Sequence, residues 1–431
     1  MERSRDDIEL TRCGGRSFCI FEVGTVTHMT FVPSPISQSE DVSTGWLPSL
    51  PSIISSIFLV AVLVGLFVLS EAQHLAVGII GGQTVTTTVD SELAGHYLGT
   101  RAAPRSAASE LIETIVSRYD EKPLNHSTLQ QLATETSLDF ATIYFSRRVL
   151  SQSDNSRLQQ RFLQELRRWR VSVLQPTPIE ISHASYRILF VPGFHYRSDP
   201  HTGADFDGPR TYLNRFGFDT ALIETQEDGT VEENAEIVAN DIRRESSTGR
   251  SLIVVSTSKG GVEAAVALGR LLDDKELESV KAWVSIGGLL RGTYLADHAI
   301  VWWKRWFVGL AFWVSGIDDR SLPGLTVQTS RKRFASLTFP KQLYMLQYVA
   351  VPLSGQVSRD VMDRYRELSA FGPNDGLTLL ADELLPGGHV ILEPGLDHFY
   401  RDRDINLKAL ALAIVVMRET AEKERREDEL Q

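Results

Sequence analysis

Cysteine is almost absent from this sequence of 431 residues. The two cysteines, Cys13 and Cys19, both lie near its beginning. The rest of the chain therefore has no residues for a disulfide framework, a thiolate metal site or a cysteine nucleophile. The near-absence of cysteine is compatible with an oxidising compartment.

Positively charged residues are fewer than negatively charged ones: the sequence has 44 Lys and Arg and 55 Asp and Glu, for a net charge of -11. Nucleic-acid binding needs clustered Lys and Arg, and no basic stripe with interleaved aromatics is present. No G-x-G-x-x-G motif follows a predicted strand, which argues against a dinucleotide-binding dehydrogenase. We therefore predict no nucleic-acid partner and no cofactor. A metal site at His195, His201, Asp205 and Asp207 is a weak alternative, because their spacing matches no known zinc pattern.

Long apolar runs are missing except for one, at residues 52–70, which carry no charge. This length is near the lower limit of the ~17–25 residues of a membrane span. A signal-peptide core of ~7–15 residues is the alternative, because the small residues of Ser70-Glu71-Ala72 suit signal peptidase. A buried core helix is a third interpretation. We expect a membrane-anchored or secreted protein that associates with membranes through residues 52–70, without a predicted orientation.

The remaining chain divides by composition and periodicity. Residues 106–174 repeat apolar positions at helical spacing, for example Leu111, Ile112 and Ile115. We expect this helical arm to pack on the main domain, with partner binding as the alternative. The predicted divisions are a disordered leader 1–51, a transmembrane or signal segment 52–72, a linker 73–105, a helical arm 106–180 and an α/β domain 181–431 with a cap insertion at about 289–341.

The α/β assignment comes from apolar strands that alternate with helical segments. Residues 187–191, 251–256 and 282–286 are continuous apolar runs, and helical patterns separate them. Strands without polar positions are typical of a parallel sheet covered by helices on both faces. We predict this architecture for residues 181–431.

A candidate nucleophile lies where one of these strands meets a helix. In S-L-I-V-V-S-T-S-K-G-G, Ser258 is flanked by the small residues Ser256 and Gly260. This is the context of a nucleophile elbow, usually G-x-S-x-G, in which the turn leaves no room for large side chains. The helix N-terminus would favour negative charge developing beside the hydroxyl. A helix N-cap serine is the structural alternative.

A serine nucleophile needs a base and an acid that orients it. His398 follows a predicted strand and precedes the last helix, at the sheet edge where ligands bind in α/β folds. Asp375, in the loop F-G-P-N-D-G, is the predicted acid, and Asp397 is the reserve because it adjoins the histidine. The oxyanion hole is expected from the backbone N–H groups of Lys259 and of Phe194, in the loop V-P-G-F-H-Y.

Together these motifs resemble the α/β-hydrolase superfamily, and within it the lipase and esterase branch. The resemblance rests on V-P-G-F-H-Y, S-T-S-K-G-G, P-N-D-G-L and L-D-H-F, in the order the family requires, and covers about residues 186–419. It implies an eight-stranded, mostly parallel sheet and hydrolysis through an acyl-enzyme on a Ser258, Asp375 and His398 triad. Ser256 and Lys259 depart from the usual elbow and leave the subfamily open.

The resemblance further implies a small-molecule or lipid ester, possibly a thioester, as substrate. Trp302, Trp303 and Trp306 fall in an apolar helical stretch of the expected cap, where they would line an acyl pocket or rest on lipid. A helix buried under the cap is the structural alternative. Two functional alternatives stay open: a non-catalytic binding module with this fold, and an acyltransferase with the same triad. The oligomeric state is not predicted.

Overall fold

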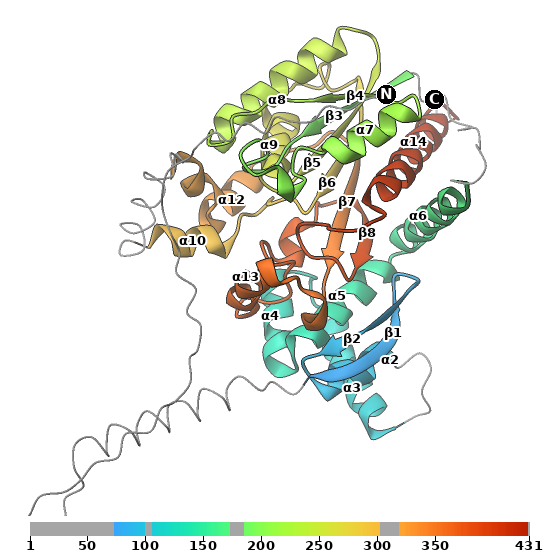
Figure 1. The fold of residues 1–431 in the computed structure, drawn as a ribbon, viewed down its shortest axis with the longest axis vertical. Coiled ribbons are helices and arrows are strands. Elements are labelled where there is room, and N and C mark those ends of the chain that lie inside the picture. Colours follow the sequence, from blue (N-terminus) through green and yellow to red (C-terminus); the bar gives the residue numbers. More distant parts are fainter. Residues whose placement is uncertain (1–72, 100–105, 173–184, 302–318, 430–431) are drawn as a thin grey trace, which may run out of the picture. The chain divides into compact units, whose positions relative to one another are not determined.

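The computed structural model describes residues 73–99, 106–172, 185–301 and 319–429. Its main sheet has six parallel strands in the order β4-β3-β5-β6-β7-β8 (Figure 1). The strands are β3 (Tyr186–Val191), β4 (Asp219–Leu222), β5 (Ser251–Thr257), β6 (Val280–Ile286), β7 (Tyr344–Val351) and β8 (His389–Pro394). The parallel α/β fold is confirmed. The expected eight strands are wrong for the described residues: their main sheet has six strands, because β1 (His74–Ile80) and β2 (Gln83–Val89) pair with each other in a separate sheet.

Helices cover both faces of this sheet, as Figure 1 shows. Helices α8 (Val231–Ser246) and α9 (Lys259–Val266) pack on one face, in a core that includes Leu252, Val254 and Trp283. Helices α7 (Asp207–Arg215) and α14 (Ile405–Glu429) pack on the other, in a core that includes Ile253 and Val255. Neighbouring residues of β5 thus face opposite layers, which explains why its central residues 252–255 are all apolar.

The predicted linker at 73–105 is wrong over residues 74–99. This segment forms an antiparallel hairpin of β1 (His74–Ile80) and β2 (Gln83–Val89), followed by α2 (Glu92–Gly99). Gly81 and Gly82 join the strands with φ of 58° and 80°, the positive values that a tight hairpin turn requires. The linker was predicted from the Gly and Thr content of this segment, but Thr, like the neighbouring Val residues, is β-branched and favours strands. Val85, Thr87 and Val89 of β2 are buried.

The predicted helical arm consists of four helices. They are α3 (Ala107–Asp120), α4 (His126–Glu135), α5 (Leu138–Ser151) and α6 (Ser153–Ser172). Ser106, Asn125 and Ser137 start the first three, because each side chain accepts a hydrogen bond from an N–H in the first turn. The arm's core is continuous with β7 and β8, and residues 70–431 form one compact unit. The arm is therefore part of the main domain.

Helix α6 closes the free edge of the main sheet at β8. The Asn155 side chain accepts a hydrogen bond from Val390 N at 2.9 Å. One turn further along, the Gln159 amide accepts from Leu392 N at 2.9 Å and donates to Leu392 O at 3.0 Å. The two amide side chains thus replace a neighbouring strand and satisfy backbone groups that an edge strand otherwise exposes.

The predicted insertion lies between β6 and β7. Its described part contains α10 (Tyr294–Ile300), η4 (Asp319–Leu325) and α12 (Val327–Phe334). Trp302, Trp303 and Trp306 lie outside the described residues, as does the segment 52–70. None of the helices in the described ranges has the length and apolar character needed to cross a membrane. The other short elements are η2 (Pro200–Thr202), η3 (Ala267–Leu271), η5 (Ser354–Gln356), α13 (Arg359–Ser369) and η6 (Leu380–Glu383).

Candidate active site

Ser258 occupies a strained turn between β5 and α9. Its backbone has φ 53° and ψ -124°, values that a residue with a side chain rarely adopts. A Cβ at Gly260 would lie 2.3 Å from Pro192 O, so only glycine fits there. These two features are what the elbow pattern predicted, and they fix the Ser258 side chain at the carboxyl end of the sheet.

The structure brings the three predicted side chains together. His398 Nε2 lies 3.1 Å from Ser258 Oγ, and His398 Nδ1 lies 2.6 Å from Asp375 Oδ2. His398 and Asp375 are both buried. In this chain of hydrogen bonds the carboxylate accepts from Nδ1–H, which leaves the Nε2 lone pair facing the serine hydroxyl.

Backbone groups hold the Asp375 carboxylate. Its Oδ1 accepts hydrogen bonds from Leu377 N at 2.9 Å and Thr378 N at 2.8 Å, and its carbonyl accepts from His398 N at 2.9 Å. Asp397, the reserve acid, is engaged elsewhere, because its Oδ2 accepts from Ser358 N at 2.9 Å. The geometry therefore selects Asp375 as the partner of His398.

The two residues expected to supply the oxyanion hole both lie next to Ser258. Lys259 is the first residue of α9, where a backbone N–H has no partner within the helix. Phe194 follows Gly193, at which a Cβ would lie 3.3 Å from the Cβ of Ser258. The loop that carries Phe194 thus passes directly against the serine, and Phe194 and Ser258 line the same cavity.

The Lys259 side chain points into the protein rather than toward the cavity. Its Nζ donates to Gly229 O at 2.7 Å and Glu227 O at 3.2 Å, and it pairs with buried Glu263 at 3.0 Å. Asn234 also donates to Glu263, at 2.8 Å. Burial raises the pKa of Glu263 to about 7, against the opposing effect of Lys259. The sequence analysis missed this pair, although a Lys and a Glu four residues apart in an apolar helix are a usable signal.

Glu227 fixes the loop after Phe194. Its Oε1 accepts from Arg197 N at 2.6 Å and Ser198 N at 2.9 Å. Lys259 of α9 also donates a hydrogen bond to the backbone carbonyl of Glu227. The same network therefore connects α9 with the loop that carries Phe194. This connection sets the relative position of the two candidate oxyanion donors.

Ser256, which stands where the elbow motif usually has its first glycine, forms hydrogen bonds in the core. Its Oγ accepts a hydrogen bond from Trp283 Nε1 at 2.9 Å and donates to Val284 O at 3.4 Å. Both residues are fully buried, so the hydroxyl satisfies an indole N–H that would otherwise lack a partner. The departure from glycine therefore supports the sheet without obstructing Ser258.

A second carboxyl group missed by the sequence analysis lies near Asp375. Glu383 is buried, and neither of its oxygens has a hydrogen-bond partner among the described residues. Burial, together with the nearby carboxylate of Asp375, raises the pKa of Glu383 well above its usual value. Both effects favour the neutral form of the side chain, which while protonated adds no second negative charge beside Asp375.

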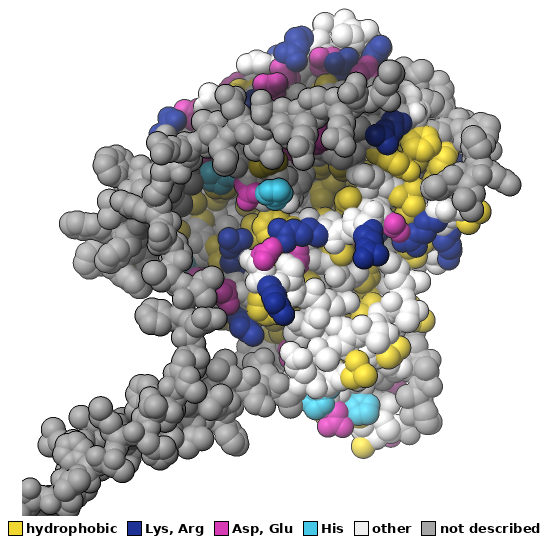
Figure 2. Space-filling model, viewed as in Figure 1, with side chains coloured by type: hydrophobic (Ala, Val, Ile, Leu, Met, Phe, Trp, Pro, Cys, Tyr) yellow, Lys and Arg dark blue, Asp and Glu magenta, His cyan; other side chains and the backbone are white. Residues whose placement is uncertain are grey.

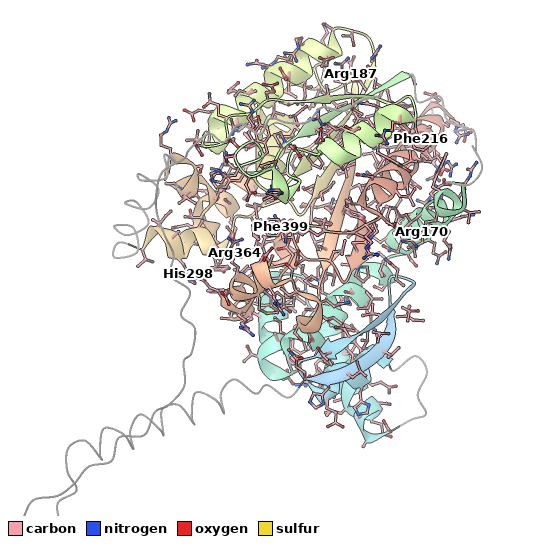
Figure 3. The ribbon with its side chains drawn as sticks, in the orientation of Figure 1. Arg170, Arg187, Phe216, His298, Arg364 and Phe399 are labelled. Carbon is pink, nitrogen blue, oxygen red and sulfur yellow. The ribbon has the colours of Figure 1, made fainter. Side chains whose placement is uncertain are left out.

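The cavity in front of Ser258 has a volume of about 1040 Å³ and an apolar interior. His195, His201 and Arg364 line its outer part together with Phe399. Figure 2 shows basic and histidine side chains around a recess in which apolar side chains are visible, and Figure 3 labels Arg364 and Phe399 on this side of the molecule. The described residues contain no group of three His, Cys, Asp or Glu side chains able to hold a metal ion.

The order of strands and site residues identifies the fold. The serine follows β5, the acid follows β7 and the histidine follows β8, while the loop after β3 lies against the serine. The fold is that of an α/β hydrolase. The resemblance drawn from the sequence motifs is thus confirmed at the level of fold.

No protein-family model and no curated protein sequence matches this chain. Among solved structures, the metagenomic carboxyl esterase MGS0156 is similar at 22% identity, covering 59% of this chain and 79% of the esterase, with a TM-score of 0.44. The mature Bacillus licheniformis lipase BlEst2 is 22% identical over 57% of this chain and 96% of its own, with a TM-score of 0.45. Phospholipase PlaB from Legionella pneumophila is 13% identical over 46% of this chain and 45% of PlaB, with a TM-score of 0.34.

Proposed function

We propose that this protein is a serine hydrolase that cleaves carboxylic esters through an acyl-enzyme. The observation that carries the proposal is the hydrogen-bonded series Ser258, His398 and Asp375, with distances of 3.1 and 2.6 Å, at the wall of an apolar cavity. A serine hydroxyl becomes a nucleophile at neutral pH only when such a base removes its proton.

In the first half-reaction, Ser258 Oγ attacks the ester carbonyl carbon while His398 Nε2 takes the hydroxyl proton. Asp375 stabilises the imidazolium, and the N–H groups of Phe194 and Lys259 donate hydrogen bonds to the carbonyl oxygen as it becomes negative. The tetrahedral intermediate then collapses. The alcohol leaves with the proton from His398, and the acyl group stays on Ser258.

In the second half-reaction, water replaces the alcohol. His398 removes a proton from this water, whose oxygen attacks the acyl carbon, and then returns the proton to Ser258 Oγ as the carboxylic acid leaves. The Asp375 carboxylate keeps the ring of His398 in the same orientation in both half-reactions, because its other oxygen is fixed by two backbone N–H groups.

Labelling of the purified full chain with a fluorophosphonate probe tests this proposal. We expect wild type to react, Ser258→Ala to remain unlabelled, and Ser247→Ala, which changes an exposed serine at the end of α8, to react like wild type. Hydrolysis of p-nitrophenyl butyrate should fall more than about 1,000-fold in Ser258→Ala. A folded wild-type protein that neither labels nor hydrolyses the ester would favour a binding module. Transfer of the acyl group to an added alcohol in preference to water would identify an acyltransferase.

We further propose that residues 52–70 attach this hydrolase to a membrane or direct its secretion, which is supported by their uncharged, apolar sequence. Expression of the full chain and of a variant with Val62→Asp and Val64→Asp tests this, followed by separation of membrane, soluble and secreted fractions. We expect the double substitution to move the protein into the soluble cell fraction. An unchanged distribution would contradict the proposal.

A further inference from the structure

The cavity at Ser258 continues far below the triad, along one face of the main sheet. Strand pairing defines its depth, because Ile188 of β3 lies beside Ile253 of β5, and Phe190 lies beside Val255. All four residues line the cavity. Ile253 precedes Ser258 by five residues, which corresponds to about 16 Å along an extended strand.

Helix α14 lines the opposite wall over the same length. Its lining residues recur at helical spacing, so they form one stripe of the helix: Ile405, Lys408, Ala409, Leu412, Ala413 and Val416. The stripe from the first to the last of them spans about 16 Å at the rise of an α-helix. The lengths measured along β5 and along α14 thus give the same depth for the cavity. Pro209 and Leu213 of α7 line its side.

Polar side chains are confined to the outer part of this cavity. His195, His201 and Arg364 line the region near the loops, whereas the residues that line the level of Phe190 and below are all apolar. Lys408 is the one charged side chain of the α14 stripe, and its ammonium is neutralised by Glu393 at 2.7 Å and by Asp402. A polar group is therefore accommodated at the mouth, and only an apolar group fits the deep part.

We propose that this deep cavity is a tunnel for the acyl chain of a long, unbranched ester, such as a lipid. The proposal rests on the function proposed above, because the ester carbonyl is placed at Ser258 and the chain runs from there between the sheet and α14. About 16 Å corresponds to roughly 12 carbon atoms of an extended chain, given C–C bonds of about 1.5 Å and near-tetrahedral angles. The leaving alcohol then lies at the polar mouth.

The proposal predicts how activity depends on chain length. Each further methylene buried in the tunnel raises kcat/KM by up to about fourfold, so p-nitrophenyl esters should improve from 2 to about 12 carbons and then level off. Ala409 and Ala413 line the tunnel one turn of α14 apart, about 6 Å. Leucine at either position keeps the helix and fills the space.

We expect Ala413→Leu to lower kcat/KM for the 12-carbon ester at least tenfold and to leave the 4-carbon ester within twofold of wild type. Ala409→Leu, nearer to Ser258, should shift the loss to shorter esters. Ala421→Leu is the matched control, because it makes the same change on the same helix outside the cavity lining. A wild-type profile that is flat above 4 carbons, or an Ala413→Leu profile identical to wild type, would overturn the tunnel and leave the hydrolase intact.

Binding to the Ser258→Ala protein separates the tunnel from catalysis. We expect dodecanoate to displace fluorescent parinaric acid from this variant, butyrate to fail, and the added Ala413→Leu change to weaken dodecanoate binding at least tenfold. These results would support the tunnel even if wild type cleaved no ester, in which case only the proposed catalysis would fall. Equal displacement by the two acids, or no effect of Ala413→Leu, would overturn it.

Discussion

The two faces of the main sheet carry different structures although the same strands form both. On the face covered by α8 and α9, Trp283, Leu252 and Val254 are fully enclosed, and buried Lys259 forms an ion pair with buried Glu263. On the face covered by α7 and α14, Ile253 and Val255 line the cavity instead. One strand thus supports a filled core with one set of alternating side chains and a ligand space with the other.

This difference indicates where substitutions should affect stability and where they should affect substrate choice. The enclosed face has close-packed side chains, so a lost group leaves a void or an unpaired charge. Side chains on the cavity face already adjoin empty space and lose fewer contacts on truncation. Three experiments, in addition to those on the tunnel variants described above, test this contrast in stability and substrate choice.

The largest effect is expected from Lys259→Met on the enclosed face. The change leaves the Glu263 carboxylate buried beside Asn234 without its cation, and we expect a loss of about 3–5 kcal/mol in the free energy of unfolding at pH 8. Urea unfolding followed by circular dichroism measures it. The double variant Lys259→Met with Glu263→Met should recover most of the loss, because no charge then remains. A double variant as unstable as the single one would mean that the backbone bonds of Lys259 matter more than the pair.

Glu383→Gln tests a buried carboxyl that has no cation, in contrast to Glu263. The pKa of Glu383 lies well above its usual 4.5, so between those two pKa values the folded protein keeps a proton that the unfolded chain releases. The contribution of protonated Glu383 to the free energy of unfolding is therefore complete below pH 4.5. It falls by about 1.4 kcal/mol per pH unit as the pH rises toward the pKa of Glu383 in the folded protein. Because Gln cannot ionise, the variant should gain stability over wild type with that slope as the pH rises from about 5 toward the folded-state pKa of Glu383. Urea unfolding at a series of pH values measures this gain. If the free energies of unfolding of wild type and Glu383→Gln changed in parallel with pH, an elevated pKa of Glu383 would be contradicted.

The smallest effect compares neighbouring residues of β5. Val254 has no exposed surface and faces α9, whereas Val255 is 9% exposed and lines the cavity. We expect Val254→Ala to cost about 2–3 kcal/mol and Val255→Ala about 1 kcal/mol. The preference for ester chain length should show the opposite pattern. Val255→Ala should change it, and Val254→Ala should not. Equal costs from thermal unfolding would mean that the cavity face is packed as tightly as the other.

The grouping of Ser258, Asp375 and His398 was predictable from sequence because each of these residues carries a local constraint. Ser258 needs small neighbours, Asp375 needs a tight turn, and His398 must follow the last strand. The cavity was not predictable, since Ala409 and Ala413 lie in an apolar helix that reads as ordinary core, and the space depends on how far α14 stands from the sheet. The β1–β2 hairpin was missed because the segment combines a Gly-Gly turn with a Thr-rich second strand, which was interpreted as a linker. The sequence around Asn155 and Gln159 did not indicate that their helix hydrogen-bonds to a strand edge.

The amide contacts of α6 have a consequence for how the chain is cut or assembled. If the region before β3 were removed, Val390 and Leu392 would present unpaired N–H and C=O groups along the outermost strand. Such a strand readily recruits the same strand of another molecule, so a fragment prepared without α6 should self-associate edge to edge and precipitate. We therefore infer that Asn155 and Gln159 protect this edge against aggregation, and that a monodisperse protein needs the helical region.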